Sequence, residues 1–149
     1  MKIIETDILI QSSPAKVWMV LTDFQRYPDW NPFIQEASGE VETGARLKVR
    51  IAPPGWKPMT IQPMVCTVSS GAELRWIGHL VFPGLFDGEH VFQIEQAGQD
   101  QVRFRQSEQF RGILVPFFPS TLYERTRRGF EAMNQALKET VEKLHGKES

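Results

Sequence analysis

Alternating apolar and polar side chains over residues 89–110 predict a β-hairpin with one apolar face. Successive side chains of a strand point to opposite faces, so every second residue shares a face. We place the loop over 97–100 and pair His90 with Glu108. The same register fixes the other inward pairs, Phe92 with Gln106 and Ile94 with Phe104. The inner row is therefore apolar except at one end, where an imidazole, an amide and a carboxylate lie together.

These polar side chains need partners on an apolar inner face, which are each other, water or a ligand. An internal pocket is the first hypothesis. His90 and Glu108 have two interpretations. As an acid/base pair, with Gln106 nearby, they would transfer a proton during a reaction. As a structural pair, they would bond each other and close one end of the sheet.

Apolar residues at spacings of three and four predict a long helix near the end of the chain. Thr121 and Glu124 match a capping box at its start, and Gly146 favours a stop. A helix of about 24 residues spans roughly 36 Å, so it needs a sheet of similar size beneath it. The apolar stripe consists of Leu122, Thr126, Phe130, Met133, Leu137, Val141 and Leu144.

The rest of the pattern predicts strands with two short helices after the first. Residues 2–11 alternate as a strand, and Ser13 with Pro14 starts a helix that ends near residue 23. Pro28 and Pro32 limit the next helix to a short turn. Further strands are expected over 33–38, 45–51, 60–69 and 73–82. We therefore expect an α+β fold, in which a curved antiparallel sheet of about seven strands wraps around the C-terminal helix.

Length and composition indicate a single domain over residues 1–149. Hydrophobic residues make up 41% and charged residues 23%, and the net charge of -1 gives no field for nucleic acid. The lone Cys66 excludes an internal disulfide. The N-terminus lacks the apolar core of a signal peptide, and no apolar run approaches the roughly 20 residues that span a bilayer. We expect a cytoplasmic location and no stable membrane insertion; the pattern leaves the oligomeric state open.

Six local motifs follow one another along the chain: SPAKVW at 13–18, YPDWNPF at 27–33, LRWIG at 74–78, GEHVF at 88–92, EQFRG at 108–112 and GFEAMN at 129–134. In this order they resemble the START-like superfamily with the helix-grip fold, also called SRPBCC or polyketide cyclase/dehydrase-like. The resemblance covers nearly the whole chain. It implies a deep, mostly apolar cavity between sheet and long helix. Because this superfamily holds lipid carriers, hormone receptors, cyclases, oxygenase domains and chaperone regulators, function must be argued from the site.

The aromatic residues exceed what one small core usually holds, which favours a ligand pocket over a solid core. Glycine inside a helix costs roughly 1 kcal/mol relative to alanine, so Gly129 needs a reason. Room for a ligand and a close contact with the sheet would each supply one. The expected ligand-binding residues are Trp30, Phe33, Trp76, Phe92, Phe104, Gln106, Phe117, Phe118, Thr126, Gly129, Phe130 and Met133.

Two apolar segments broken by prolines, 113–118 and 53–58, are expected to flank the entrance. Segment 113–118 has two other interpretations, a surface for a protein partner and a buried crossover. Trp56 in the second segment, if exposed, would contact a ligand or partner.

Other chemistries have no support in the sequence. His79, His90 and His145 lack ligand spacing, and His90 with Glu108 gives two ligands where metal sites use three or four. There is no P-loop, no Gly-x-Ser-x-Gly and no Gly-x-Gly-x-x-Gly.

We therefore expect a protein that binds a hydrophobic small molecule, a lipid or polyketide-like compound, without a cofactor. It would act as a carrier, sensor or sequestering protein. One alternative is a cyclase or dehydratase in which His90 or Glu108 moves a proton. The other is a protein-interaction module that uses segment 113–118 and the cavity as a groove for a peptide.

Overall fold

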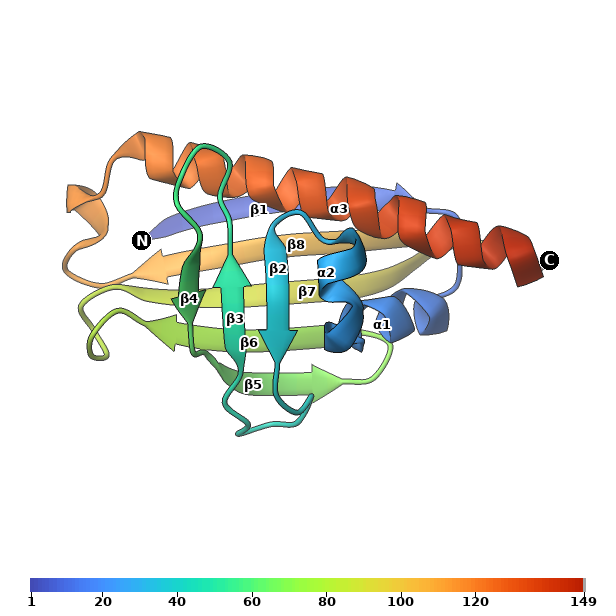
Figure 1. Cartoon of the computed structure of the whole chain (residues 1–149), viewed down its shortest axis with the longest axis horizontal. Helices are drawn as coiled ribbons and strands as arrows, with labels where there is room; N and C mark the ends of the chain where they lie inside the picture. The colour runs from blue at the N-terminus through green and yellow to red at the C-terminus, as the bar shows by residue number, and fades with distance from the viewer. Residues whose placement is uncertain (149) are drawn as a thin grey trace.

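Strands in two antiparallel sheets curve around one long helix (Figure 1). The structure is a computed structural model that describes residues 1–148. One sheet has five strands, in the order β1 (Lys2–Ile10), β8 (Gln101–Arg111), β7 (Asp87–Gly98), β6 (Glu73–His79) and β5 (Met64–Ser69). The other has three, in the order β2 (Ile34–Ser38), β3 (Lys48–Ile51) and β4 (Met59–Ile61). The expected α+β helix-grip fold is confirmed, with eight strands where about seven were predicted.

The helices are α1 (Pro14–Thr22), the short turns η1 (Phe24–Arg26) and α2 (Tyr27–Trp30), η2 (Val115–Phe117) and the long α3 (Ser120–Glu148). As predicted, the Ser13 side chain caps α1, because its Oγ accepts from Lys16 N at 3.3 Å. Figure 1 shows α1 beside the C-terminal half of α3. There Gln11 N donates to Glu142 at 2.8 Å, which ties the end of β1 to α3.

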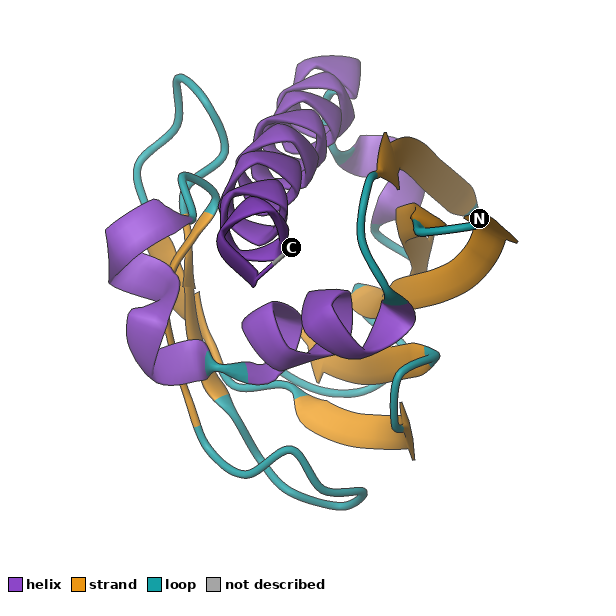
Figure 2. Ribbon diagram, turned by 90° about the vertical axis from the view of Figure 1, so that its right-hand side faces the viewer, coloured by secondary structure: helices purple, strands orange, loops and turns teal. Residues whose placement is uncertain are grey.

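Helix α3 lies between the two sheets, and Figure 2 views it nearly along its axis. The predicted stripe is confirmed. Leu122 and Leu144, at its two ends, are partly buried. Its central members are buried: Thr126, Phe130, Met133, Leu137 and Val141.

Both predicted ends of α3 are wrong. The helix begins at Ser120, ahead of Thr121, and Leu122 N donates to Pro119 O at 3.0 Å. The proline carbonyl therefore starts the helix where the capping box was expected. At the other end α3 continues through Gly146, which is not among the glycines with positive φ. A glycine ends a helix by adopting the left-handed conformation, and Gly146 does not adopt it.

The hairpin of β7 and β8 has the predicted register with a shorter turn. Gly98 pairs with Gln101, so only Gln99 and Asp100 form the turn. Asp100 has φ 53°, in the left-handed region that two-residue hairpin turns use. A register shift between Gln96 and Gly98 adds one residue to β7, so Gln96 pairs with Val102 and His90 with Glu108. A four-residue loop over 97–100 would instead have paired Gln96 with Gln101 and His90 with Ser107, so the predicted loop is wrong although the predicted pairs are confirmed.

The segment predicted as one strand over 60–69 is two strands, one in each sheet. Pro63, which has no backbone N–H, lies at the break between β4 and β5. The predicted strand over 45–51 starts at Lys48, because residues 45–47 instead pair with the start of β5. Val65 N donates to Ala45 O and Leu47 N donates to Pro63 O, both at 2.8 Å. These bonds join the two sheets.

Helix α3 packs tightly against the segment leading into β2 at Gly129. A Cβ at this position would overlap the ring of Phe33, whose Cε1 would lie 2.7 Å away. The backbone of Phe33 is held in place, because Phe33 N and Ile34 N both donate to Asn31 Oδ1 at 3.0 and 2.9 Å. Of the two reasons considered for a glycine here, the structure therefore shows the close contact.

We expect Gly129→Ala to lower the free energy of unfolding by up to about 2 kcal/mol, because overpacking costs roughly 1–3 kcal/mol and a gain in helix propensity offsets about 1 kcal/mol of it. Gly146→Ala is the matched control, since a Cβ there meets no atom within 4 Å. It should raise stability slightly. Chemical denaturation of both variants measures the difference, and equal effects at the two positions would contradict the packing argument.

Candidate functional site

His90 lies at the centre of the inner face of the five-stranded sheet, enclosed by aromatic rings. It is 4% exposed and pairs with Glu108 across the hairpin, as predicted. Its ring centroid lies 4.4 Å from that of Phe92, 4.9 Å from Phe130 and 5.3 Å from Trp76. The other two predicted pairs, Phe92 with Gln106 and Ile94 with Phe104, are confirmed as well.

A chain of hydrogen bonds runs from His90 through α3 to β1. His90 Nε2 lies 2.9 Å from Gln106 Oε1, and Gln106 Nε2 donates to Asn134 Oδ1 at 2.8 Å. Asn134 Nδ2 donates to Thr6 Oγ1 at 2.9 Å, and the Thr6 hydroxyl donates to Gln106 O at 2.8 Å. His90, Gln106 and Asn134 are buried. The chain therefore satisfies polar groups that would be costly without partners.

The direction of this chain fixes which nitrogen of His90 carries a proton. The Thr6 hydroxyl gives its proton to a backbone carbonyl, so its oxygen accepts from Asn134. Gln106 Nε2 also lies 3.5 Å from Phe130 O, an acceptor, which sets the orientation of the amide. Gln106 Oε1 then faces His90 as an acceptor, so His90 donates from Nε2. Nδ1 is left to face Glu108.

Glu108 lies where the inner face meets solvent. Its side chain is 17% exposed, whereas Gln106, the preceding inner residue, is fully buried. Glu108 Oε1 lies 3.5 Å from His90 Nδ1. A Cβ at Gly88 would overlap Glu108 Oε2, so the glycine leaves room for the carboxylate. The structure thus brings together the pair that was proposed for acid/base chemistry.

Aromatic rings fill the space where the sequence led us to expect a cavity. Ring centroids lie 5.1 Å apart for Trp76 and Phe92, and 5.4 Å apart for Phe33 and Phe130. An open cavity between α3 and the sheets is therefore not confirmed. The expected ligand residues in this packed group are all buried: Phe33, Trp76, Phe92, Phe104, Gln106, Phe130 and Met133.

A second aromatic group, the rim cluster, closes the interior beside Glu108. It consists of Phe86, Phe110, Phe118 and Tyr123. Phe86 is central, 4.4 Å from Phe118 and 5.5 Å from Phe110 between ring centroids. The Tyr123 hydroxyl donates to Val115 O at 2.9 Å, and burial raises the pKa of Tyr123. The rim cluster thus joins β8, α3 and the segments before β7 and after β8.

The segments predicted to flank an entrance differ in how they attach. In segment 113–118, Ile113 and Phe117 are 71% and 80% exposed, and Val115 is buried, so it is not a buried crossover. Segment 53–58 attaches to α3, since Arg125 donates to Gly55 O at 2.6 Å and lies over the Trp56 ring.

Some expected ligand residues do not join the packed group around His90. Phe117 faces solvent. Trp30 is partly buried and packs on Tyr27, with ring centroids 5.2 Å apart, and its indole N–H has no partner. The Thr126 hydroxyl donates to Leu122 O within α3. Phe118 belongs to the rim cluster.

Three residues of the site escaped the sequence analysis: Thr6, Asn134 and Gly88. Each carried a signal. Thr6 is a polar residue in the inner row of the first strand, Asn134 directly follows Met133 of the helix stripe, and Gly88 opens the GEHVF motif. Only the fold places Asn134 against Thr6, because 128 residues separate them along the chain.

A family model for polyketide cyclase/dehydrase and lipid transport proteins matches residues 1–142. The chain belongs to this family. A search of curated proteins finds no match.

Solved structures show the START-like fold of this family member. A START superfamily protein from Mycobacterium smegmatis aligns with TM-score 0.76 and 16% identity over 95% of this chain and 98% of its own. The di-domain ARO/CYC BexL of the BE-7585A biosynthetic pathway aligns with TM-score 0.74 and 15% identity, over 95% of this chain and 47% of its own. A norcoclaurine synthase point mutant from Thalictrum aligns with TM-score 0.66 and 15% identity, over 97% and 96%. Identities this low show the fold alone.

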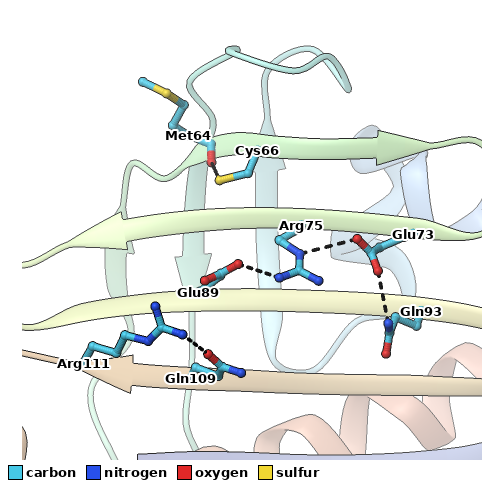
Figure 3. Close-up of polar contacts among 8 residues, drawn as sticks. All are labelled: Met64, Cys66, Glu73, Arg75, Glu89, Gln93, Gln109 and Arg111. Carbon is cyan, nitrogen blue, oxygen red and sulfur yellow. Dashed lines mark hydrogen bonds and ion pairs between the residues drawn. The ribbon is translucent and has the colours of Figure 1, made fainter. Parts of the chain in front are cut away.

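The outer face of the same sheet carries a separate polar network (Figure 3). Arg75 donates to Glu89 at 2.7 Å and lies 3.4 Å from Glu73, which accepts from Gln93 at 3.1 Å. The hydrogen bond to Glu89 raises the pKa of Arg75. Burial raises the pKa of the nearby Cys66 thiol. The pair of Arg75 with Glu89 and the hydrogen bond of Gln93 to Glu73 join β6 to β7 and stabilise the sheet from its outer face.

No three His, Cys, Asp or Glu side chains among the described residues gather closely enough to hold a metal ion. None of the helices formed by these residues is both long and apolar enough to cross a membrane.

Replacing Gln106 with leucine should lower the free energy of unfolding by about 1–3 kcal/mol, because Asn134 Oδ1 and His90 Nε2 lose their buried partners. Gln109→Leu is the control on the outer face of β8, where Gln109 bonds only Arg111. It should change stability by about 0.5 kcal/mol or less. Denaturant titrations measure both changes. If Gln106→Leu leaves the free energy of unfolding unchanged, the hydrogen-bond chain does not have the structural role given to it here.

Amide hydrogen exchange should be faster in segments 53–58 and 113–118 than in residues 90–108. The two segments contain exposed apolar side chains and few strand bonds, and entrance segments are drawn from regions of low local stability. Mass spectrometry of peptic fragments measures the rates. Equal protection in all three segments would argue against an entrance there.

Proposed function

We propose that this family member binds a hydrophobic small molecule, a lipid or polyketide-like compound, between α3 and the sheets, as a carrier, sensor or sequestering protein. The observation that carries the proposal is Glu108. It is a carboxylate on the inner face of β8, reached by solvent, beside an interior lined by aromatic rings. A core that served stability alone would gain nothing from a carboxylate at this position. Ligand pockets combine such apolar linings with a few polar groups.

The ring of Phe33 is the side chain that a ligand would displace. Its backbone is held by the Asn31 side chain and by Ala52 N, which donates to Phe33 O at 2.8 Å. The ring itself makes only apolar contacts, with Gly129 and Phe130. It can therefore rotate without breaking a backbone hydrogen bond. Rotation would empty the space beside Gly129 that the ring occupies. It would open an apolar path that continues past Phe130 toward His90 and Glu108.

A surface hollow lies near the polar end of this path, close to Glu108. It has a volume of about 350 Å³ and lies between β1 and the first turns of α3, with Ile4 and Tyr123 among its lining residues. Ile4 pairs with Glu108 across β1 and β8, and Tyr123 belongs to the rim cluster. A short movement of the rim cluster would connect this hollow with the carboxylate.

The methionines supply a direct test of interior binding. Of the five, Met133 is fully buried on the inner face of α3, whereas Met1, Met19, Met59 and Met64 are exposed. In protein labelled at the methionine methyl groups, a neutral apolar probe such as N-phenyl-1-naphthylamine should shift the NMR signal of Met133 and leave that of Met19 unchanged.

Two results would count against the proposal. A saturable shift of exposed methionines without Met133 would place binding on the surface. No shift of Met133 with any neutral apolar probe, up to its solubility limit, would mean that the interior stays closed. Native mass spectrometry of protein purified from its own source, searching for a co-purified lipid or polyketide, gives a second readout.

The adjacency of His90 and Glu108 favours one alternative, an enzyme of the cyclase or dehydratase type. In that case His90→Phe or Glu108→Gln would lower conversion of the ligand by roughly a hundredfold or more while binding persists. If the pair only positions ligand and sheet, the same variants change stability or affinity and no conversion is found.

A further inference from the structure

The inner site presents hydrogen-bond acceptors at its polar end. His90 uses Nε2 as a donor to Gln106, so in the neutral imidazole the lone pair of Nδ1 faces Glu108 Oε1 at 3.5 Å. This distance exceeds the 2.7–3.2 Å range of an N–H···O hydrogen bond. Glu108 Oε2 overlies Gly88 and has no hydrogen-bond partner in the part of the chain that the structure describes. Three acceptor atoms therefore converge without a donor among them.

A proton on His90 Nδ1 would leave Glu108 Oε2 as the remaining acceptor. It would make the imidazole and Glu108 an ion pair and would use Oε1. Oε2 would remain without a donor. In either state the carboxylate needs a hydrogen-bond donor from outside the chain.

The neighbouring donors are already used within the protein. Gln106 Nε2 donates to Asn134, and Asn134 Nδ2 donates to Thr6. Among residues 1–146, whose side chains the structure describes, no lysine or arginine is buried. A ligand carboxylate at Glu108 would therefore meet a like charge without a buried lysine or arginine to offset it, because Lys2 and Arg127, the basic residues of the surface hollow, are not buried. Its desolvation would be costly.

We propose that the ligand carries an amine or hydroxyl group at its polar end, which donates to Glu108 and His90 Nδ1, and that carboxylate ligands such as fatty acids are disfavoured. This inference rests on the proposed function and specifies its ligand class. Gly88 contributes by leaving the space beside Glu108 Oε2 free of a side chain.

Three probes with one alkyl chain test the headgroup: decylamine and decanoate, each below its critical micelle concentration, and decanol below its solubility limit. Affinity is read from the NMR shift of the Met133 methyl group. We expect decylamine and decanol to bind at least roughly tenfold more tightly than decanoate, on the scale of one charge-assisted hydrogen bond.

Glu108→Gln should weaken the binding of decylamine by roughly tenfold and bring the affinity of decanoate close to that of decanol. The amide oxygen of glutamine still accepts a hydrogen bond, but the negative charge is gone. Glu95→Gln is the matched control. It removes one negative charge from the outer face of the same hairpin, where Glu95 pairs with the exposed Arg105. It should leave all three affinities unchanged, which separates local contact from net charge.

The outcomes separate the inference from the function on which it rests. If decanoate binds as tightly as decanol in the unchanged protein, the donor inference is wrong and interior binding stands. Such a result would point to the buried, unpartnered donors Trp30 Nε1 and Asn31 Nδ2 as a carboxylate site. If no probe shifts Met133, the proposed function itself fails. The order of the three probe affinities in the unchanged protein tests the donor inference even if Glu108→Gln does not fold.

Discussion

The position of α3 on the sheet depends on the buried hydrogen-bond chain from His90 to Thr6. Asn134 of α3 is its central member, accepting from Gln106 of β8 and donating to Thr6 of β1. Sliding α3 by one residue would separate these groups and leave buried donors and acceptors unpaired, each at a cost of about 1–3 kcal/mol. Apolar packing alone tolerates many alignments of helix and sheet. The polar chain selects one of them.

That alignment decides what the interior can hold. With Asn134 fixed, Gly129 faces Phe33 and Phe130 faces His90. The helix backbone comes close to the segment before β2 at Gly129, a residue without a side chain. The ring of Phe33 packs there on the interior, and Glu108 lies at the solvent-facing end of the inner row. The same short row of residues therefore supplies both the structural hydrogen bonds and the candidate binding groups.

Much of this arrangement follows from local pattern. Alternation in residues 89–110 predicted the three central inward pairs of the hairpin, because a one-residue slip would turn an apolar row to solvent. The helix stripe was likewise predicted, since burial of one face repeats every three or four residues. The ends of α3 were not, because Pro119 and Gly146 act through backbone geometry that the stripe does not encode.

The site was predictable in part. His90 and Glu108 stand out as polar residues in an apolar row, but their partners lie on elements that only the folded chain brings near. Nothing in the sequence distinguishes Phe33, which packs on Gly129, from Phe117, which faces solvent, since both lie next to prolines. The packed state of the interior is also a property of side-chain rotamers, which composition does not reveal.

The central claim is that the ring of Phe33 occupies ligand space. A crystal structure of the complex with decanol tests it most directly. The account predicts that the Phe33 ring has left Gly129, that the alkyl chain lies in its place, and that the hydroxyl is within hydrogen-bond distance of Glu108. Decanol bound only outside the sheets, with Phe33 still packed on Gly129, would contradict it.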